Sequence, residues 1–161
     1  MAATPHFDPA PLPTDLADLA VAAELLPWVP NGQGLSFKPL HYSPSTGMWV
    51  NLIRVAPGGH ISRHLHTGGS VHGYVLKGSW RYLEHDWVAE AGSYVWEPPG
   101  DVHTLEVRGD EEMITLFFVH GVIQYLDESD RLIQQDDMRS RQRRYLEHCE
   151  AEGIEPRALI G

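Results

Sequence analysis

The chain has 161 residues, a length that fits one domain and can bury an apolar core without disulfides or a structural metal. Its net charge of −10 argues against nucleic acid and an anionic membrane as partners, because both bind basic surfaces. The single cysteine, Cys149, excludes an internal disulfide, so the fold does not depend on an oxidising compartment. We therefore expect a small-molecule partner and a cytoplasmic location.

The N-terminal region is rich in proline over residues 1–14, which predicts an extended arm. Asp15 can cap a short helix over residues 16–26 that ends at Pro27. The first basic side chain is Lys38, and acidic residues interrupt the early apolar stretch, so we expect no signal peptide. No run approaches the roughly 18 apolar residues of a membrane helix.

Residues 34–126 differ in composition from the N-terminal region and contain short runs of β-branched and aromatic residues separated by Gly, Pro, Asp and Asn. This pattern predicts an antiparallel β-barrel and an all-β fold class. The expected strands are 36–42, 48–56, 62–66, 72–78, 79–85, 87–91, 93–97, 103–107 and 113–121.

The tail is free of Gly and Pro over residues 134–152, which predicts a helix packed on the barrel or on a neighbouring subunit. Met138, Tyr145 and Leu146 can form its apolar stripe, and its mixed charges indicate a solvated face. We therefore divide a single domain into an arm with a short helix (1–33), a barrel (34–126) and a helical tail (127–161).

His64 and His66 are two residues apart in a run typical of a strand, so their side chains point to the same face. Both imidazoles can then reach one metal ion. The pair alone is weak evidence, because the chain has 10 histidines and accidental spacings are expected. Glycine turns on both sides of the pair, and a second motif further along, make the pattern specific.

Gly58, His64, His66 and Gly78 form a first motif, and Gly92, Pro98, Gly100 and His103 form a second. The order and spacing of these residues resemble those of the two motifs of the cupin superfamily. The resemblance covers residues 34–126. It implies an antiparallel jelly-roll barrel that holds one divalent metal on His64, His66 and His103.

The first motif departs from the usual cupin pattern, because Val71 stands where a glutamate ligand is typical. Neither Val71 nor Ser70 is a good replacement ligand, and His72 is expected on the other face of its strand. Three-histidine cupins of this kind resemble acetylacetone dioxygenase and 2,4'-dihydroxyacetophenone dioxygenase. That resemblance implies iron(II) and cleavage by O2 of a C–C bond beside a carbonyl in an aromatic ketol or a diketone.

Other readings of the same motifs stay open. Zinc, nickel or manganese can occupy such a site, and many cupins resemble non-oxidative isomerases or decarboxylases. A third possibility is a metal or ligand sensor similar to the cupin half of ChrR-type anti-sigma factors. Those proteins have an N-terminal zinc-binding module, whereas this chain has only His6 and no cysteine among its first thirty residues.

Two charged residues near the motifs are candidates for catalysis. Glu97 precedes Pro98 and can hold a ligand imidazole or accept a substrate proton, the alternative being a surface acid at a strand end. Arg81 can bind an oxyanion if its face of the strand is the lumen, the alternative being an outward salt bridge.

Aromatic residues and further histidines complete the candidate pocket. Tyr74, Trp96 and Phe118, together with Phe117 and Tyr125, are candidates to line an aromatic-substrate cavity, although aromatics in short strands are usually core. His120 ends a strand and can reach the barrel mouth, although a hydrogen-bonded structural histidine is the favoured alternative. His60 shares strand parity with His64 and His66, but its place after a Pro-Gly-Gly turn favours a turn residue. We also expect a homo-oligomer, a dimer or a tetramer, because open sheet edges favour assembly.

Overall fold

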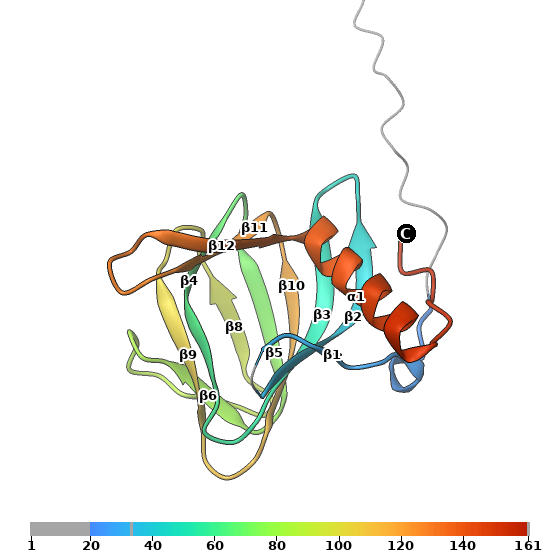
Figure 1. Ribbon diagram of the computed structural model, residues 1–161. Coiled ribbons are helices and arrows are strands. Elements are labelled where there is room, and N and C mark those ends of the chain that lie inside the picture. The colour runs from blue at the N-terminus through green and yellow to red at the C-terminus, as the bar shows by residue number, and fades with distance from the viewer. Residues whose placement is uncertain (1–19, 33, 161) are drawn as a thin grey trace, which may run out of the picture.

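The computed structural model describes residues 20–32 and 34–160, which form two six-stranded antiparallel sheets facing each other across one core (Figure 1). The first sheet has the order β1-β2-β3-β10-β5-β8, and the second has the order β12-β11-β4-β9-β6-β7. Neighbours in each sheet include strands far apart in sequence, as a jelly roll requires. The predicted all-β jelly-roll fold with a C-terminal helix is confirmed.

The strands of the first sheet are β1 (Val29–Pro30), β2 (Leu35–Ser43), β3 (Met48–Val55), β10 (Met113–Val119), β5 (Val71–Lys77) and β8 (Tyr94–Glu97). Those of the second sheet are β12 (Leu132–Asp137), β11 (Val122–Leu126), β4 (His60–Thr67), β9 (His103–Arg108), β6 (Ser79–Tyr82) and β7 (Ala89–Glu90). The 3-10 turn η1 (Ala23–Leu25) precedes β1, and helix α1 (Met138–Glu152) follows β12.

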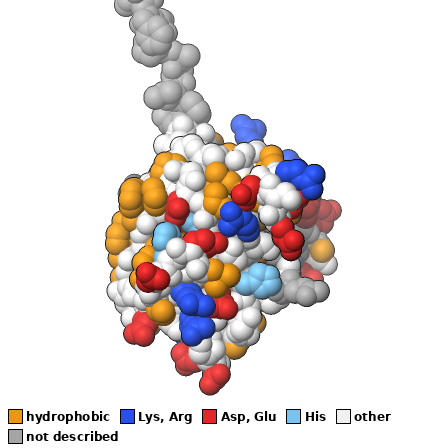
Figure 2. All heavy atoms as spheres, turned by 90° about the vertical axis from the view of Figure 1, so that its left-hand side faces the viewer, with side chains coloured by type: hydrophobic (Ala, Val, Ile, Leu, Met, Phe, Trp, Pro, Cys, Tyr) orange, Lys and Arg blue, Asp and Glu red, His pale blue; other side chains and the backbone are white. Residues whose placement is uncertain are grey.

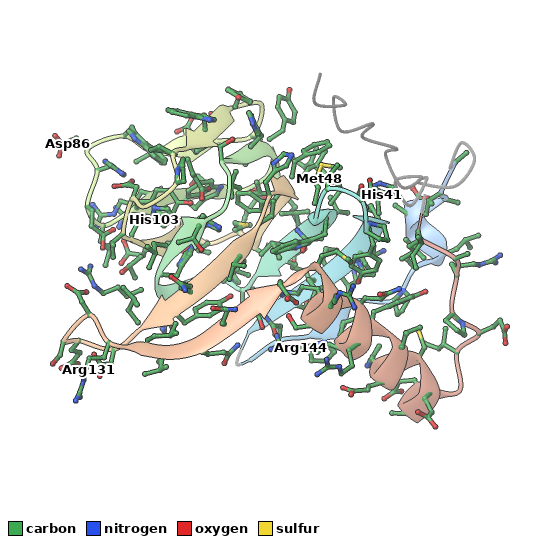
Figure 3. All side chains as sticks on the ribbon, turned by 90° about the horizontal axis from the view of Figure 1, so that it is seen from above. His41, Met48, Asp86, His103, Arg131 and Arg144 are labelled. Carbon is green, nitrogen blue, oxygen red and sulfur yellow. The ribbon has the colours of Figure 1, made fainter. Side chains whose placement is uncertain are left out.

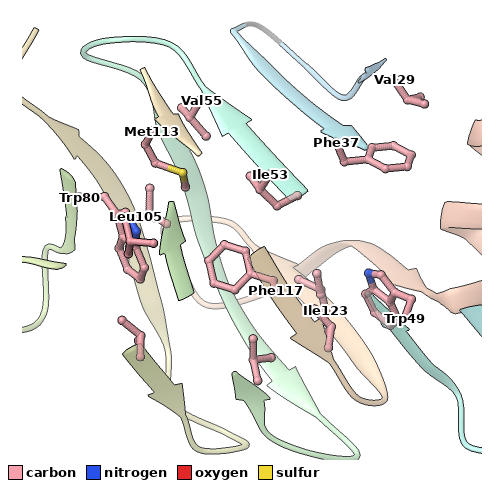
Figure 4. Close-up of a cluster of buried hydrophobic side chains, with 14 of the residues drawn as sticks. Val29, Phe37, Trp49, Ile53, Val55, Trp80, Leu105, Met113, Phe117 and Ile123 are labelled. Carbon is pink, nitrogen blue, oxygen red and sulfur yellow. The ribbon is translucent and has the colours of Figure 1, made fainter. Parts of the chain in front are cut away.

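The core lies between the two sheets because alternate side chains of each strand point inward. Along β10, Met113, Thr115, Phe117 and Val119 are buried, while the residues between them face outward. Figure 4 shows Phe117 in the interior among side chains from both sheets, including Ile53 and Ile123. This alternation decides which functional side chains can reach the interior.

Gly78 allows β5 and β6 to turn tightly against the β10 strand. It has a φ of +70°, and a Cβ at this position would lie 2.5 Å from the Glu112 carbonyl oxygen. A side chain here would force the backbone apart, so the glycine in the first motif has a direct structural reason.

The C-terminal segment differs from the prediction. Residues 134–137 continue β12, where Gln135 pairs with Gln124 of β11, and the helix starts only at Met138. Asp137 and Ser140 form a capping box at that point, which fixes the start of α1. The barrel therefore extends to Asp137 rather than ending at residue 126, and β1 joins it before residue 34.

The buried face of α1 is also different from the expected apolar stripe. Met138 and Tyr145 are buried as predicted, but Leu146 is exposed and Arg141 is buried in its place. The helix lies against β2 and β12 at one side of the barrel (Figure 1). Its charges therefore do not all belong to a solvated face.

The predicted N-terminal helix is not formed over the described part of its range. Residues 20–22 have no helical structure and only η1 follows, while residues 16–19 and the expected arm lie outside the described residues. No helix in the described ranges is long and apolar enough to cross a membrane. Acidic and basic side chains are interspersed on the face shown in Figure 2, in agreement with ion pairs such as those of Arg63 with Glu84 and Asp130.

Candidate metal centre

Three buried histidines converge inside the barrel. His64 and His66 project inward from β4, and His103 is the first residue of β9, where it pairs directly with His64. One nitrogen from each ring lies within 4.8 Å of the others. His103 lies inside the barrel in the view from above (Figure 3). The three side chains are therefore close enough to share one ion.

A bulge in β4 separates this pair from His60. The register of β4 with β9 shifts between Ile61 and His64, so Ile61 packs against the core while His60 is exposed. The parity that His60 shares with His64 in the sequence is broken at this bulge. His60 therefore does not reach the three histidines.

The protonation of His64 suits a metal ligand. Its Nδ1 lies 2.7 Å from the Ser62 carbonyl oxygen, and because a carbonyl only accepts, Nδ1 carries the proton. Nε2 is then free to bind a metal. Burial, followed by the neighbouring His103 and His66, lowers the pKa of His64 to about 3. The ring is thus neutral at ordinary pH.

Glu97 supplies a carboxylate beside the histidines. It lies on β8 opposite Val71 of β5, and only 3% of its surface is exposed. Its Oε2 is 3.0 Å from His66 Nε2 and 3.5 Å from His103 Nε2. The acidic group that is missing at Val71 is therefore present on the neighbouring strand.

Tyr82 holds both Glu97 and His103. Its hydroxyl donates to Glu97 Oε1, and its ring stacks on the His103 imidazole with a centroid distance of 3.9 Å. Burial opposes ionisation of Glu97, but the adjacent His103 and His66 imidazoles outweigh it and lower the pKa of Glu97. Burial and the nearby Glu97 carboxylate raise the pKa of Tyr82, so this hydroxyl stays a donor.

The residues present fit a divalent metal. His66 Nδ1 and both nitrogens of His103 are buried and have no hydrogen-bond partner among the described residues. Buried polar atoms without partners cost free energy, and an ion would supply a partner to several of them at once. His64, His66 and His103 would hold the ion, since imidazole ligands suit iron, zinc and nickel.

The histidines open into a small apolar cavity. Its volume is about 50 Å³, and its walls include Ile53, Leu105, Phe117, Val119 and Ile123. Four lining residues, Asn31, Leu35, Ile61 and Tyr125, also line an outer depression of about 580 Å³. The outer depression therefore adjoins the cavity along these four residues.

Several predicted site residues lie elsewhere. Arg81 alternates with the buried Trp80 and Tyr82, so it faces outward, and its Nε is 2.9 Å from Glu106 Oε2. The outward salt bridge, which the sequence left open as the alternative, is therefore the arrangement observed, because Trp80 and Tyr82 occupy the inward side of β6. Arg81 therefore does not reach the histidines.

Three of the aromatic candidates also point outward, because they lie on the outer faces of their strands. Tyr74, Trp96 and Phe118 are 46%, 55% and 39% exposed, because the residues beside them on β5, β8 and β10 face the core. His120 lies beside His72, with its Nδ1 3.2 Å from the Ser70 carbonyl oxygen, and not in the cavity wall. Only Phe117 and Tyr125 of the predicted aromatics line the cavity.

Several polar cavity residues were not recognised from the sequence, among them Tyr82 and Arg141. Tyr82 lies on the inward face of β6 and Arg81 on the outward face, and strand alternation alone does not say which of the two faces is the interior. Arg141 lines the cavity from α1, and no spacing in the sequence connects it with the histidines.

Comparisons with known proteins agree with this geometry. Residues 16–124 match the family described as ChrR Cupin-like domain. An RmlC-like cupin protein from Ralstonia eutropha JMP134 is 34% identical and superposes with a TM-score of 0.85, covering 91% of this chain and 96% of that one.

An acetylacetone dioxygenase from Acinetobacter johnsonii has the same fold at 20% identity, with a TM-score of 0.71, and the match covers 83% of this chain and 93% of that one. The search of curated proteins found no match. The family match covers more than half of the residues, and the three-histidine site lies within it. The chain therefore belongs to the ChrR cupin-like domain family of the cupin superfamily.

Proposed function

We propose that this protein is a mononuclear iron(II) dioxygenase that cleaves the C–C bond beside a carbonyl in a small ketol or diketone. In such a reaction a 2-hydroxyketone and O2 give a carboxylic acid and formic acid, with one oxygen atom entering each product. The observation that carries the proposal is the contact of Glu97 with two of the three buried histidines that can share one ion.

A divalent ion held by the three histidines would supply Lewis acidity to two oxygen atoms of a chelating substrate. Glu97 is ionised, and its Oε2 faces the nitrogens of His66 and His103, so it is placed to accept the proton from the carbon between or beside the carbonyls. Tyr82 keeps the other carboxylate oxygen in position. The apolar walls exclude water from the reacting groups.

The size of the cavity bears on the substrate. Benzene occupies an engineered cavity of about 150 Å³ in another protein, whereas the cavity beside these histidines has about 50 Å³. A small aliphatic diketone or ketol therefore fits better than the expected 2,4'-dihydroxyacetophenone. The aryl ring of that substrate would extend into the outer depression.

Oxygen uptake tests the proposal. The protein is purified without oxygen, loaded with iron(II) to one ion per chain, and given acetylacetone or 2,4'-dihydroxyacetophenone in an oxygen electrode. We expect uptake that depends on substrate and iron, faster with the aliphatic diketone, and no uptake with zinc in place of iron. Absence of uptake with both substrates at full iron occupancy would contradict the proposal, and turnover without oxygen would point to an isomerase or decarboxylase.

The family match favours one second candidate, a non-enzymatic metal or ligand sensor. A sensor binds its metal and ligand at the same histidines but does not turn the ligand over. Stable binding of a sigma factor in a pull-down, together with no oxygen uptake and no product, would support this candidate over the enzyme.

A further inference from the structure

Arg141 brings a buried positive charge to the cavity that holds the histidines. It lies in the first turns of α1, only 3% of its surface is exposed, and it lines the same cavity as His64, His66 and Glu97. Its Nε and Nη1 have no hydrogen-bond partner among the described residues. A buried guanidinium donor without a hydrogen-bond partner costs free energy, and a ligand that accepts its hydrogen bonds would offset that cost.

The neighbouring acid does not account for this charge. Asp136 is fully buried, and Arg144 already binds both of its oxygens, at 2.6 Å and 3.1 Å, where α1 meets the barrel (Figure 3). Arg141 adds one contact of 3.0 Å through Nη2. Two guanidinium groups therefore share one carboxylate, which leaves the cluster with an excess positive charge.

The other contacts of Arg141 leave its remaining donors free. Tyr125 accepts a hydrogen bond from Nη2 at 3.2 Å, and the Phe37 ring lies 5.1 Å from the guanidinium carbon. A ring face attracts the cation but does not replace a hydrogen-bond acceptor for Nε and Nη1. Among the described residues, no carboxylate besides Asp136 forms an ion pair with Arg141.

The positive charge is a short distance from the histidines. The Tyr125 ring centroid is 5.7 Å from that of His64, and the hydroxyl of the same tyrosine contacts Arg141. Trp49 Nε1 is a second buried donor without a partner among the described residues, and Trp49 lines the same cavity. Both side chains therefore border the cavity that His64 and His66 also line.

We propose that Arg141 binds the carboxylate of a small anionic substrate whose carbonyl end faces His64, His66 and His103. This inference rests on the proposed function and narrows its substrate class to keto acids or related carboxylates. A carboxylate provides the acceptors that Nε and Nη1 lack and cancels the excess charge of the cluster. Trp49 Nε1 is the neutral donor to the same group.

Binding of acetate to the full-length chain tests this site without any turnover. Calorimetry compares acetate with acetamide, its neutral isostere, in the metal-loaded and the chelator-treated protein. We expect acetate to bind at least tenfold more tightly than acetamide in both forms. Arg141→Met is expected to weaken acetate binding at least tenfold, whereas Arg143→Met, on the exposed side of the same helix, leaves it unchanged.

A second measurement covers the case in which Arg141→Met does not fold. In the wild-type protein, the NMR resonance of the Arg141 Nε–H is expected to shift on titration with acetate and not with acetamide. Equal affinity of the Arg141→Met variant for acetate, or no shift of this resonance, would overturn the inference. Acetate binding without oxygen uptake would support the anion site and reject only the proposed reaction. Oxygen uptake with neutral diketones, without binding of acetate, would support the reaction and reject the anion site.

Discussion

The two ends of the cavity differ in the kind of buried polar atom that has no partner. At one end, His66 and His103 have buried ring nitrogens without a hydrogen-bond partner among the described residues, and the Glu97 carboxylate lies beside them. At the other end, Arg141 and Arg144 both pair with Asp136, and Nε and Nη1 of Arg141 are buried without a hydrogen-bond partner in the part of the chain that the structure describes. The first end suits a cation and the second suits an anion, so the cavity is built to orient a ligand with two unlike ends.

Removing the histidines is expected to have the largest effect, because they are the ligands of the cation end. His64→Ala, His66→Ala and His103→Ala are each expected to abolish metal retention after dialysis while the barrel stays folded by circular dichroism. His60→Ala is the control and retains the metal, since His60 is exposed beyond the β4 bulge. Loss of metal in the His60 variant but not in the His103 variant would contradict the ligand assignment.

Glu97→Gln tests the carboxylate at the same end. We expect turnover to fall by about 10²–10⁴-fold, the usual contribution of a positioned acid or base. Metal content is expected to stay the same, because the three histidines are kept. Glu90→Gln, on the exposed end of β7, is the control with unchanged turnover. Wild-type turnover in the Glu97 variant would rule out its role.

Asp136→Asn tests the anion end through stability. Asp136 is the only carboxylate that pairs with the buried Arg141 among the described residues, so its loss leaves that charge uncompensated. We expect the free energy of unfolding to fall by about 3–5 kcal/mol in urea titrations. Asp127→Asn breaks an exposed pair with Arg131 and is expected to cost less than about 1 kcal/mol. Equal costs for the two variants would refute the buried charge cluster.

The pKa of His64 makes the metal-free protein sensitive to acid. The pKa is about 3 in the folded chain and roughly 6.5 when unfolded, so the unfolded chain binds a proton first as the pH falls. The free energy of unfolding is therefore expected to decrease below about pH 6.5, by up to ~1.4 kcal/mol per pH unit for this one group. Urea titrations of the metal-free protein at about pH 7, 6 and 5 measure this decrease in the free energy of unfolding.

The matched comparison for that slope is the His64→Gln variant, also free of metal. Its difference from the wild type removes the contributions of the other titrating groups. We expect the variant to lose less stability between neutral and acidic pH. An identical slope in both proteins would mean that His64 is not held neutral by its surroundings.

Arg81→Gln is expected to have the smallest effect. Its exposed pair with Glu106 lies outside the cavity, so turnover and metal content are expected to match the wild type. Stability is expected to change by less than about 1 kcal/mol. A large loss of turnover would support a catalytic role for Arg81 and contradict the conclusion drawn from its outward position.

The sequence predicted the cation end much better than the anion end, for a physical reason. His64 and His66 are related by strand alternation, which is local, and the turns of the second motif bring His103 beside them. Glu97 was also within reach of this reasoning. The inward face of β6 stayed open, however, because strand alternation places Tyr82 and Arg81 on opposite faces without saying which one is the interior.

The anion end depends on contacts between distant segments. Residues 134–137 contain no Gly or Pro, yet pairing with β11 makes them a strand, and this sets where α1 begins. The start of α1 in turn determines which arginine is buried. A row of mixed charges on a helix is usually solvated, and only the packing of α1 against β2 and β12 makes Arg141 an exception.

The most direct test of the central claim is a crystal structure of the iron-loaded protein with anomalous diffraction at the iron edge. We predict one anomalous peak per chain, within bonding distance of one nitrogen each of His64, His66 and His103, and with Glu97 facing it. A peak at another position, or ligation by His60 or His120 in place of one of the three, would contradict the account.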